Sequence, residues 1–198
     1  MKVFAAGLSL AVQGFPALPH VETELQAIKQ LYGSEPLLNQ QFVVPALEHA
    51  LQASPFSIVH LASHAQFAGE ADETFVLTFD GRLSLDHLDQ FIGLFRFHDT
   101  PLELLTLSAC ETAAGDDRAA LGLAGVAIKA GARSVLATLW AVHDQAAAAL
   151  VSEFYTHLQR SSVSRAQALR SAQTRLLADQ RYQHPAYWSA FLLLNNWL

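Results

Sequence analysis

The single cysteine of the chain and one of its nine histidines each follow an apolar run, where a side chain could act as a catalyst. Cys110 comes after "LELLTLSA" and His64 after "PFSIVHLA". A thiol becomes a good nucleophile when an imidazole takes its proton or stabilises the thiolate. The two residues could form such a pair if the two runs are neighbouring strands. Otherwise Cys110 is a small buried hydrophobe, and His64 satisfies a backbone group.

The segments that must position this pair are of two alternating kinds. One kind is a short apolar run, and the other is a longer stretch in which apolar residues recur every three or four positions, as in a helix. The apolar runs predict strands at residues 3–10, 36–43, 55–62, 102–109, 134–142 and 187–197. A hairpin is expected to turn at Asp80-Gly81. Helices are expected at 20–31, 45–52, 119–130, 144–159 and 164–179, and after Ser84, with Ser84, Asp144 and Ser164 as N-caps. In the first of these helices Val21, Leu25, Ile28 and Leu31 form an apolar stripe, and Gly33 is expected to end it. Apolar strands separated by helices favour an α/β fold with a mostly parallel sheet covered on both faces.

The composition is that of one folded domain. The chain has 198 residues, of which 52% are hydrophobic and 15% are charged, so a disordered chain is excluded. The net charge is −6 and no basic cluster stands out, which argues against nucleic acid or an anionic membrane as a partner. The opening "MKVFAAGLSLAVQGFPAL" reads as a core strand or as a signal peptide. We expect one domain over 1–198, cut from a longer protein.

The sequence offers no metal or phosphate site. His60 and His64 are four residues apart, but on a strand and the loop after it, and neither an HExxH pattern nor a cysteine pair is present. The glycines of "GLAGVAIKAGA" are not followed by the Lys-Ser/Thr of a phosphate loop. We therefore expect no metal and no cofactor.

Four segments in order resemble the CHAT domain, a caspase-like family in the caspase/separase clan of cysteine peptidases that is often joined to TPR repeats. They are "VHLASHAQF", "LSACETAAG", "GLAGVAIKAGARSVLATLWAVHD" and "HPAYWSAFLLLNNW". The resemblance implies a three-layer αβα sandwich around a mostly parallel sheet of about six strands. It also implies a catalytic dyad of His64 and Cys110. In caspases the histidine lies about 50 residues before the cysteine, and here the separation is 46 residues (64 to 110).

The resemblance implies further site residues. The backbone amides of Ala65 and Cys110 would form the oxyanion hole. The family commonly has glycine where Ala65 stands, and alanine disfavours positive φ, so we expect Ala65→Gly to raise activity. Asp144, in "LWAVHD", corresponds to the acidic residue with which separases hold a substrate arginine, or it caps the helix after it. Glu111 shapes the substrate pocket or is a solvated carboxylate.

These residues together predict a cysteine endopeptidase that cleaves protein substrates after a basic residue, is latent in isolation and needs no cofactor. The alternative is a scaffold or interaction module that keeps the dyad without useful turnover. Expected partners are a protein or peptide substrate, TPR or other regulatory domains of the same or another chain, and a second copy along the C-terminal edge strand. We expect a cytoplasmic location and no nucleic-acid or membrane partner.

Overall fold

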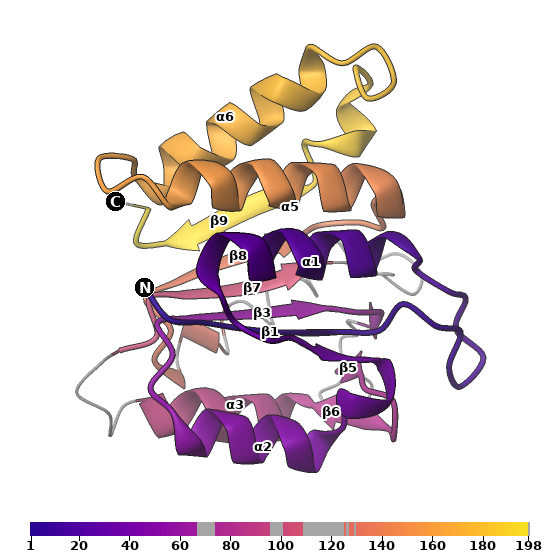
Figure 1. Ribbon diagram of the computed structural model, residues 1–198, viewed down its shortest axis with the longest axis vertical. Coiled ribbons are helices and arrows are strands. Elements are labelled where there is room, and N and C mark those ends of the chain that lie inside the picture. The colour runs from indigo at the N-terminus through magenta and orange to yellow at the C-terminus, as the bar shows by residue number, and fades with distance from the viewer. Residues whose placement is uncertain (67–73, 96–100, 109–124, 126, 129, 198) are drawn as a thin grey trace.

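A six-stranded sheet lies at the centre of the fold (Figure 1). Its strands are, from one edge to the other, β2 (Leu37–Leu38), β1 (Val3–Gly7), β3 (Ile58–Ala62), β7 (Leu104–Ser108), β8 (Ser134–Thr138) and β9 (Phe191–Asn195). The first five run parallel, and β9 pairs antiparallel with β8. The computed structural model describes residues 1–66, 74–95, 101–108, 125, 127–128 and 130–197. The expected mostly parallel sheet is confirmed.

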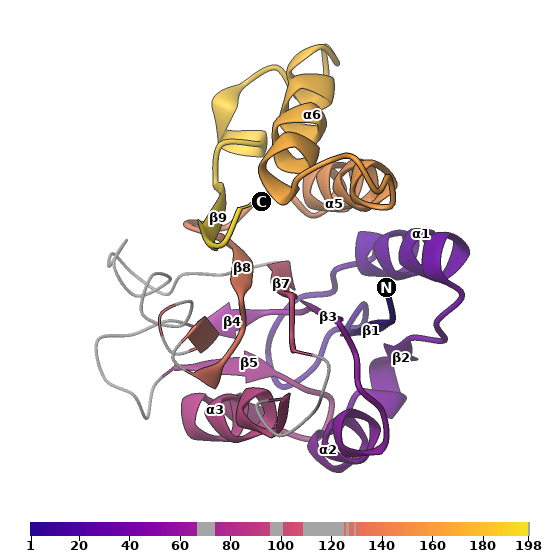
Figure 2. The same cartoon turned by 90° about the vertical axis from the view of Figure 1, so that its left-hand side faces the viewer.

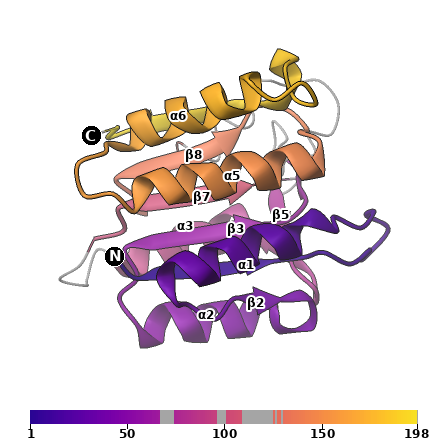
Figure 3. The ribbon, with the colours of Figure 1, turned by 45° about the horizontal axis from the view of Figure 1, so that its top comes forward.

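Helices cover both faces of this sheet, which gives three layers (Figure 2). One face carries α1 (His20–Tyr32), α5 (Asp144–Leu158) and α6 (Arg165–Leu177), which lie side by side in Figure 3. The other face carries α2 (Val44–Ala53) and α3 (Leu85–Leu94). Each face has its own cluster of buried apolar side chains, because the strands are apolar on both sides.

The helix boundaries follow from local chemistry. The stripe of Val21, Leu25 and Ile28 is buried, as the spacing predicts, and Gly33 ends α1 at φ 72° while its N–H bonds the carbonyl of Lys29. Ser164 forms a capping box at the start of α6, and Ser84 accepts the N–H of His87 at the start of α3. These three predicted boundaries are confirmed.

A second, three-stranded antiparallel sheet follows β3. It contains β4 (Ala65–Gln66), β5 (Phe75–Leu77) and β6 (Arg82–Ser84), and the predicted hairpin at Asp80-Gly81 joins β5 to β6. The two-residue strand β4 was not predicted, because so short a strand has no periodicity to detect.

Two predicted elements differ in kind or role from the structure, and the strands expected over 3–10, 134–142 and 187–197 are shorter, as the bounds of β1, β8 and β9 show. The strand expected over 36–43 is only the two residues of β2, followed by the 3-10 helix η1 (Asn39–Gln41). Asn39 has φ 53°, and its side chain bonds the backbone of Ser9, which takes the chain out of the sheet. Asp144 is the first residue of α5 rather than its N-cap, a position held by His143. Most of the helix expected over 119–130 lies outside the described residues.

The strand expected at the start of the chain is confirmed, since β1 is buried throughout and pairs with β2 and β3. Within the described part of the chain, no helix combines the length and the apolar character needed to cross a bilayer.

Candidate functional site

The predicted site residues follow strands whose carboxyl ends meet at one edge of the sheet. β3 and β7 are parallel neighbours in which Ala62 lies opposite Ser108, and the Ser63 N–H donates to the carbonyl of Ser108 at 3.1 Å. His64 comes two residues after Ala62, and Cys110 comes two residues after Ser108. The premise that the two runs are neighbouring strands is therefore confirmed. Cys110 and Glu111 themselves lie outside the described residues, so the dyad stays a prediction.

The ring of His64 is held by the loop between β1 and α1, residues 8–19. Its Nε2 atom lies 2.8 Å from the carbonyl oxygen of Pro16, and its ring centroid lies 5.1 Å from that of Phe15. A carbonyl can only accept a hydrogen bond, so Nε2 must carry the proton. In the neutral ring Nδ1 is then the unprotonated nitrogen, which is the atom that can act as a base. Sequence patterns carry no signal for this role of Pro16, because a backbone carbonyl is common to every residue type.

The tip of the β1–α1 loop is a tight turn that contacts the second sheet. Val12 and Phe15 exchange two backbone hydrogen bonds, and the residues between them, Gln13 and Gly14, have φ 52° and 85°. The Gln13 side-chain amide donates to the carbonyl of Thr78 at 3.3 Å. This turn places Phe15 against His64 on one side and against the ring of Phe75 on the other.

The start of the same loop is fixed by Asn39. The Asn39 side-chain oxygen accepts the N–H groups of Ser9 and Leu10 at 2.8 and 3.2 Å. The Ser9 hydroxyl also donates to the carboxylate of Glu22 at 2.7 Å. Ser9 and Asn39 are both buried, so these bonds satisfy polar groups that water does not reach.

Ala65 lies at the beginning of β4, directly after His64. The Leu77 N–H bonds the carbonyl of His64 at 2.8 Å, so Ala65 faces Val76 in the following, non-hydrogen-bonded pair of the antiparallel ladder. The N–H of Ala65 therefore points away from β5. The non-glycine residues with positive φ in the described chain are Gln13, Asn39 and Asn195. The backbone strain on which the expected benefit of Ala65→Gly depends is thus absent at this position.

Asp144 begins α5 but bonds a different helix. Its Oδ2 atom accepts the N–H of His20, the first residue of α1, at 2.8 Å. The loop before Asp144 is fixed to the short helix η4 (Pro185–Tyr187), because the Trp140 indole donates to the carbonyl of Ala186 at 3.3 Å. Asp144 is half-buried. The prediction that Asp144 caps the helix after it is therefore wrong, because its carboxylate caps α1 instead.

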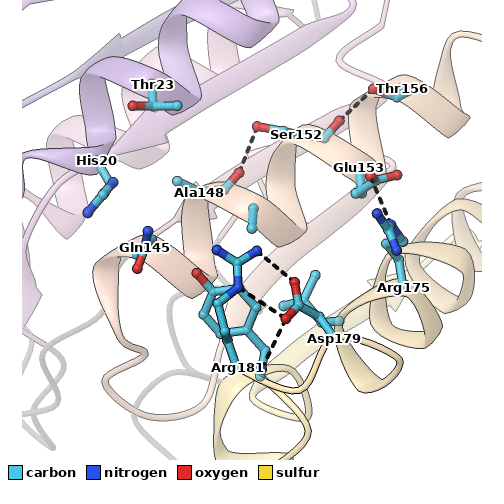
Figure 4. A pocket seen from close by; sticks show the side chains of 13 residues that line it. His20, Thr23, Gln145, Ala148, Ser152, Glu153, Thr156, Arg175, Asp179 and Arg181 are labelled. Carbon is cyan, nitrogen blue, oxygen red and sulfur yellow. Dashed lines mark hydrogen bonds and ion pairs between the residues drawn. The ribbon is translucent and has the colours of Figure 1, made fainter.

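A pocket of about 370 Å³ lies between α1, α5 and α6 (Figure 4). Its lining includes His20, which bonds Asp144, and Gln145, the residue after Asp144. Its charged groups pair with one another: Arg181 contacts Asp179 at 2.7 Å, and Arg175 contacts Glu153 at 3.7 Å. The hydrogen bonds from Arg181 lower the pKa of Asp179 to about 2. The predicted site residues within the described chain do not line this pocket.

The other histidine of the motif, His60, lies in the core, among buried polar side chains. It is fully buried, and its Nε2 atom lies 2.8 Å from a carboxylate oxygen of Glu24, a close contact that is not well aligned for a hydrogen bond. The Tyr155 hydroxyl lies 3.3 Å from Nδ1 of His60 and 2.9 Å from the hydroxyl of Thr106. Burial raises the pKa of Tyr155 well above its ordinary value. In the described part of the chain, no three His, Cys, Asp or Glu side chains are grouped as metal ligands.

Comparisons with known proteins agree with this architecture. The family model of the CHAT domain matches residues 5–196. No curated protein matches the sequence significantly. The structure of gingipain R (RgpB), described as an Arg-specific cysteine proteinase, has a TM-score of 0.66 at 8% identity. The match covers 99% of this chain and 46% of the gingipain chain. The complex of the pro- and mature domains of RgpB from Porphyromonas gingivalis has a TM-score of 0.58 at 7% identity, with coverages of 99% and 47%.

A third solved structure is similar over most of both chains. GSU0716 from Geobacter sulfurreducens has a TM-score of 0.52 at 15% identity, and the match covers 90% of this chain and 89% of that one. The chain spans less than half of the two gingipain chains, so these likenesses concern the fold. The fold is the caspase-like αβα sandwich, and since the family model covers residues 5–196, the chain belongs to the CHAT domain family.

Proposed function

We propose that this chain is a cysteine endopeptidase domain in which Cys110 is the nucleophile and His64 is its general base. The observation that carries the proposal is the pairing of β3 with β7, in which Ala62 and Ser108 are opposite each other. His64 and Cys110 follow these partners at the same offset of two residues. The contact of His64 with a backbone carbonyl, that of Pro16, is one that the non-catalytic interpretation also predicts; it is consistent with the proposal because it leaves Nδ1 as the basic nitrogen.

The proposed reaction forms and breaks bonds in two steps. The Cys110 sulfur attacks the scissile carbonyl carbon while its proton passes to Nδ1 of His64, which then donates that proton to the leaving amine as the C–N bond breaks. Water hydrolyses the thioester in the second step and regenerates the thiol. The amides of Ala65 and Cys110 would stabilise the oxyanion. The Ala65 N–H supports this role, since it is directed away from its own sheet partner.

The proposed role of Asp144 is to bind the substrate residue before the scissile bond, which gives the peptidase a preference for a basic residue at that position. One of its carboxylate oxygens accepts the His20 N–H, and the side chain is half-buried at the edge of the sheet. A carboxylate binds a guanidinium through charge-assisted hydrogen bonds. The structure of gingipain R (RgpB) is described as that of an Arg-specific cysteine proteinase, but its identity to this chain is only 8%, so a likeness in specificity is part of the proposal.

One observation favours the alternative function, a scaffold module with little turnover. His64 is only 6% exposed, so a substrate has restricted access to its ring. We propose that the peptidase is latent for this reason. A regulatory domain, or a second copy paired along the edge strand β9, would then activate it.

The test is hydrolysis of fluorogenic peptides with Arg, Lys or Ala before the scissile bond. We expect slow cleavage of the arginyl and lysyl peptides that is abolished in Cys110→Ala and in His64→Ala. His49→Ala, which changes an exposed histidine on α2, is the matched control and should cleave like the wild type. Cleavage that survives Cys110→Ala would overturn the proposed mechanism. Absence of cleavage together with an unreactive thiol would favour the scaffold module.

A further inference from the structure

The carboxylate of Asp144 supplies the side-chain cap that α1 lacks in its own sequence. The N-cap residue of α1 is Pro19, whose side chain makes no capping hydrogen bond. The first N–H groups of a helix need acceptors from outside it, and a negative charge is favourable at this end. Oδ2 of Asp144 meets this need at 2.8 Å from the His20 nitrogen, although the two residues are 124 positions apart.

The capped residue is only four positions from the carbonyl that holds His64. Pro16 and Pro19 fix two φ angles in this short stretch, which limits how far it can bend. The Leu18 N–H donates to the carbonyl of Ser9 at 2.9 Å, and the Val21 N–H donates to the carbonyl of Leu18 at 3.0 Å. A stretch restrained in this way can pass a shift of His20 on to Pro16.

Other contacts also hold the β1–α1 loop. Asn39 holds Ser9 at its start, and Gln13 bonds the carbonyl of Thr78 at its tip. Leu18, between Pro16 and His20, bonds Ser9 of the same loop and packs against the core. The hydrogen bond from His20 to Asp144 adds a contact from the C-terminal end of the loop to the segment that follows β8.

We propose that Asp144 is a positioning residue for His64. By accepting the His20 N–H it fixes Pro16, and Pro16 in turn holds the Nε2–H of His64 and orients Nδ1 as the base. How firmly His64 is held can be measured in the absence of substrate. The expected effect of Asp144 on catalysis, in contrast, rests on the proposed peptidase function. The same carboxylate would bind a basic substrate residue and hold the base, so substrate recognition and base orientation share one side chain.

Three substitutions separate the hydrogen bond from the charge. Asp144→Asn keeps an oxygen that can accept the His20 N–H but removes the charge. Asp144→Ala removes both, and Asp144→Ser keeps a polar residue at the start of α5 whose hydroxyl is too short to reach His20. Asp86→Ala is the matched control, because Asp86 is an exposed acidic residue in the first turn of α3.

The direct measurement is the exchange with water of the His64 Hε2 proton, observed by NMR on ¹⁵N-labelled protein and assigned with His64→Gln. We expect exchange to be at least about 10-fold faster in Asp144→Ala than in the wild type, because the loop opens locally. Asp144→Asn and Asp86→Ala should keep wild-type exchange. Unchanged exchange in a folded Asp144→Ala protein, or equal acceleration in Asp144→Asn, would overturn the proposal. If Asp144→Ala does not fold, Asp144→Ser is judged by the same criteria.

Kinetics give the second readout. With an arginyl peptide, Asp144→Asn should raise KM and leave kcat nearly unchanged. Asp144→Ala should also lower kcat by about 10-fold or more, because a misplaced base slows the chemical step. With an alanyl peptide Asp144→Ala should lower kcat, whereas Asp144→Asn should not. If no peptide is cleaved and the Cys110 thiol is unreactive, the proposed function fails, while the exchange measurement still decides the positioning role.

Discussion

The carbonyl oxygen of Pro16 lies 2.8 Å from Nε2 of His64, although the two residues are 48 positions apart in the chain. This contact joins the loop after β1 to the loop after β3 at the carboxyl edge of the sheet. It also determines which ring nitrogen of His64 carries the proton in the neutral state. The chemistry proposed for this domain therefore depends on a loop that contains none of its catalytic side chains.

Phe15 tests how much the loop contributes through packing. Phe15→Ala removes the ring that contacts His64 and Phe75, so we expect His64 to become more mobile and kcat to fall by about 10-fold. The loss of a half-buried ring should also lower the free energy of unfolding by about 1–2 kcal/mol. Peptide hydrolysis and urea unfolding measure the two effects. A wild-type kcat in Phe15→Ala would show that Pro16 alone is sufficient to hold His64.

Gly7 allows β1 to approach β3 and α1 closely. A Cβ atom at Gly7 would overlap the carbonyl oxygen of Ala62 and lie 2.8 Å from Cγ1 of Val21. We expect Gly7→Ala to lower the free energy of unfolding by about 1–3 kcal/mol, as overpacked cores do.

Gly93→Ala is the matched control for Gly7→Ala, because Gly93 lies within α3 and no atom is within 4 Å of an added Cβ. There alanine should stabilise the protein by about 0.5–1 kcal/mol. Thermal unfolding of both variants provides the comparison, and a Gly7→Ala protein as stable as the wild type would contradict the close approach.

Ala65→Gly tests the oxyanion loop. Since Ala65 is not at positive φ, glycine relieves no strain there, and it weakens a strand position by about 0.5–1 kcal/mol. We therefore expect kcat to stay within about 2-fold of the wild type or to fall, with only a small loss of stability. Steady-state hydrolysis measures the change. A clear rise in kcat that also requires Cys110 would show that the loop takes another conformation during catalysis.

The sequence was sufficient to predict most of the elements, because long apolar runs and helix caps are local signals. The stripe of α1, the Gly33 end and the Ser164 cap are examples. The features that it did not reveal are non-local. The capping of His20 by Asp144, the Pro16–His64 contact and the Asn39–Ser9 bond each join distant segments through backbone groups. No residue type is specific to a backbone donor or acceptor, so sequence patterns carry no signal for them.

Buried Tyr155 makes the folded protein less stable at alkaline pH. Burial raises the pKa of Tyr155 and raises that of Tyr32 to about 12, whereas an unfolded tyrosine ionises near pH 10. Above pH 10 the folded state therefore binds more protons than the unfolded state, and stability falls as the pH rises. Below pH 10 this contribution is fully present.

Tyr155→Phe should reduce the alkaline loss of stability, which urea unfolding between pH 8 and pH 11 can measure. At neutral pH the variant should be about 1 kcal/mol less stable, because the hydrogen bond with Thr106 is lost. Tyr32→Phe should change the alkaline slope in the same direction. The same slope above pH 10 in the wild type and in Tyr155→Phe would contradict a buried, protonated phenol.

The most direct test of the central claim is the rate at which iodoacetamide alkylates Cys110 as a function of pH. Because Cys110 is the only cysteine of the chain, every alkylated thiol is assigned without ambiguity. If His64 stabilises the thiolate, alkylation at pH 7 should be about 10-fold faster than that of a small-molecule thiol, and His64→Ala should abolish the difference. The His49→Ala control should react like the wild type. A thiol that reacts no faster than a free thiol, or equally fast with and without His64, would contradict the account.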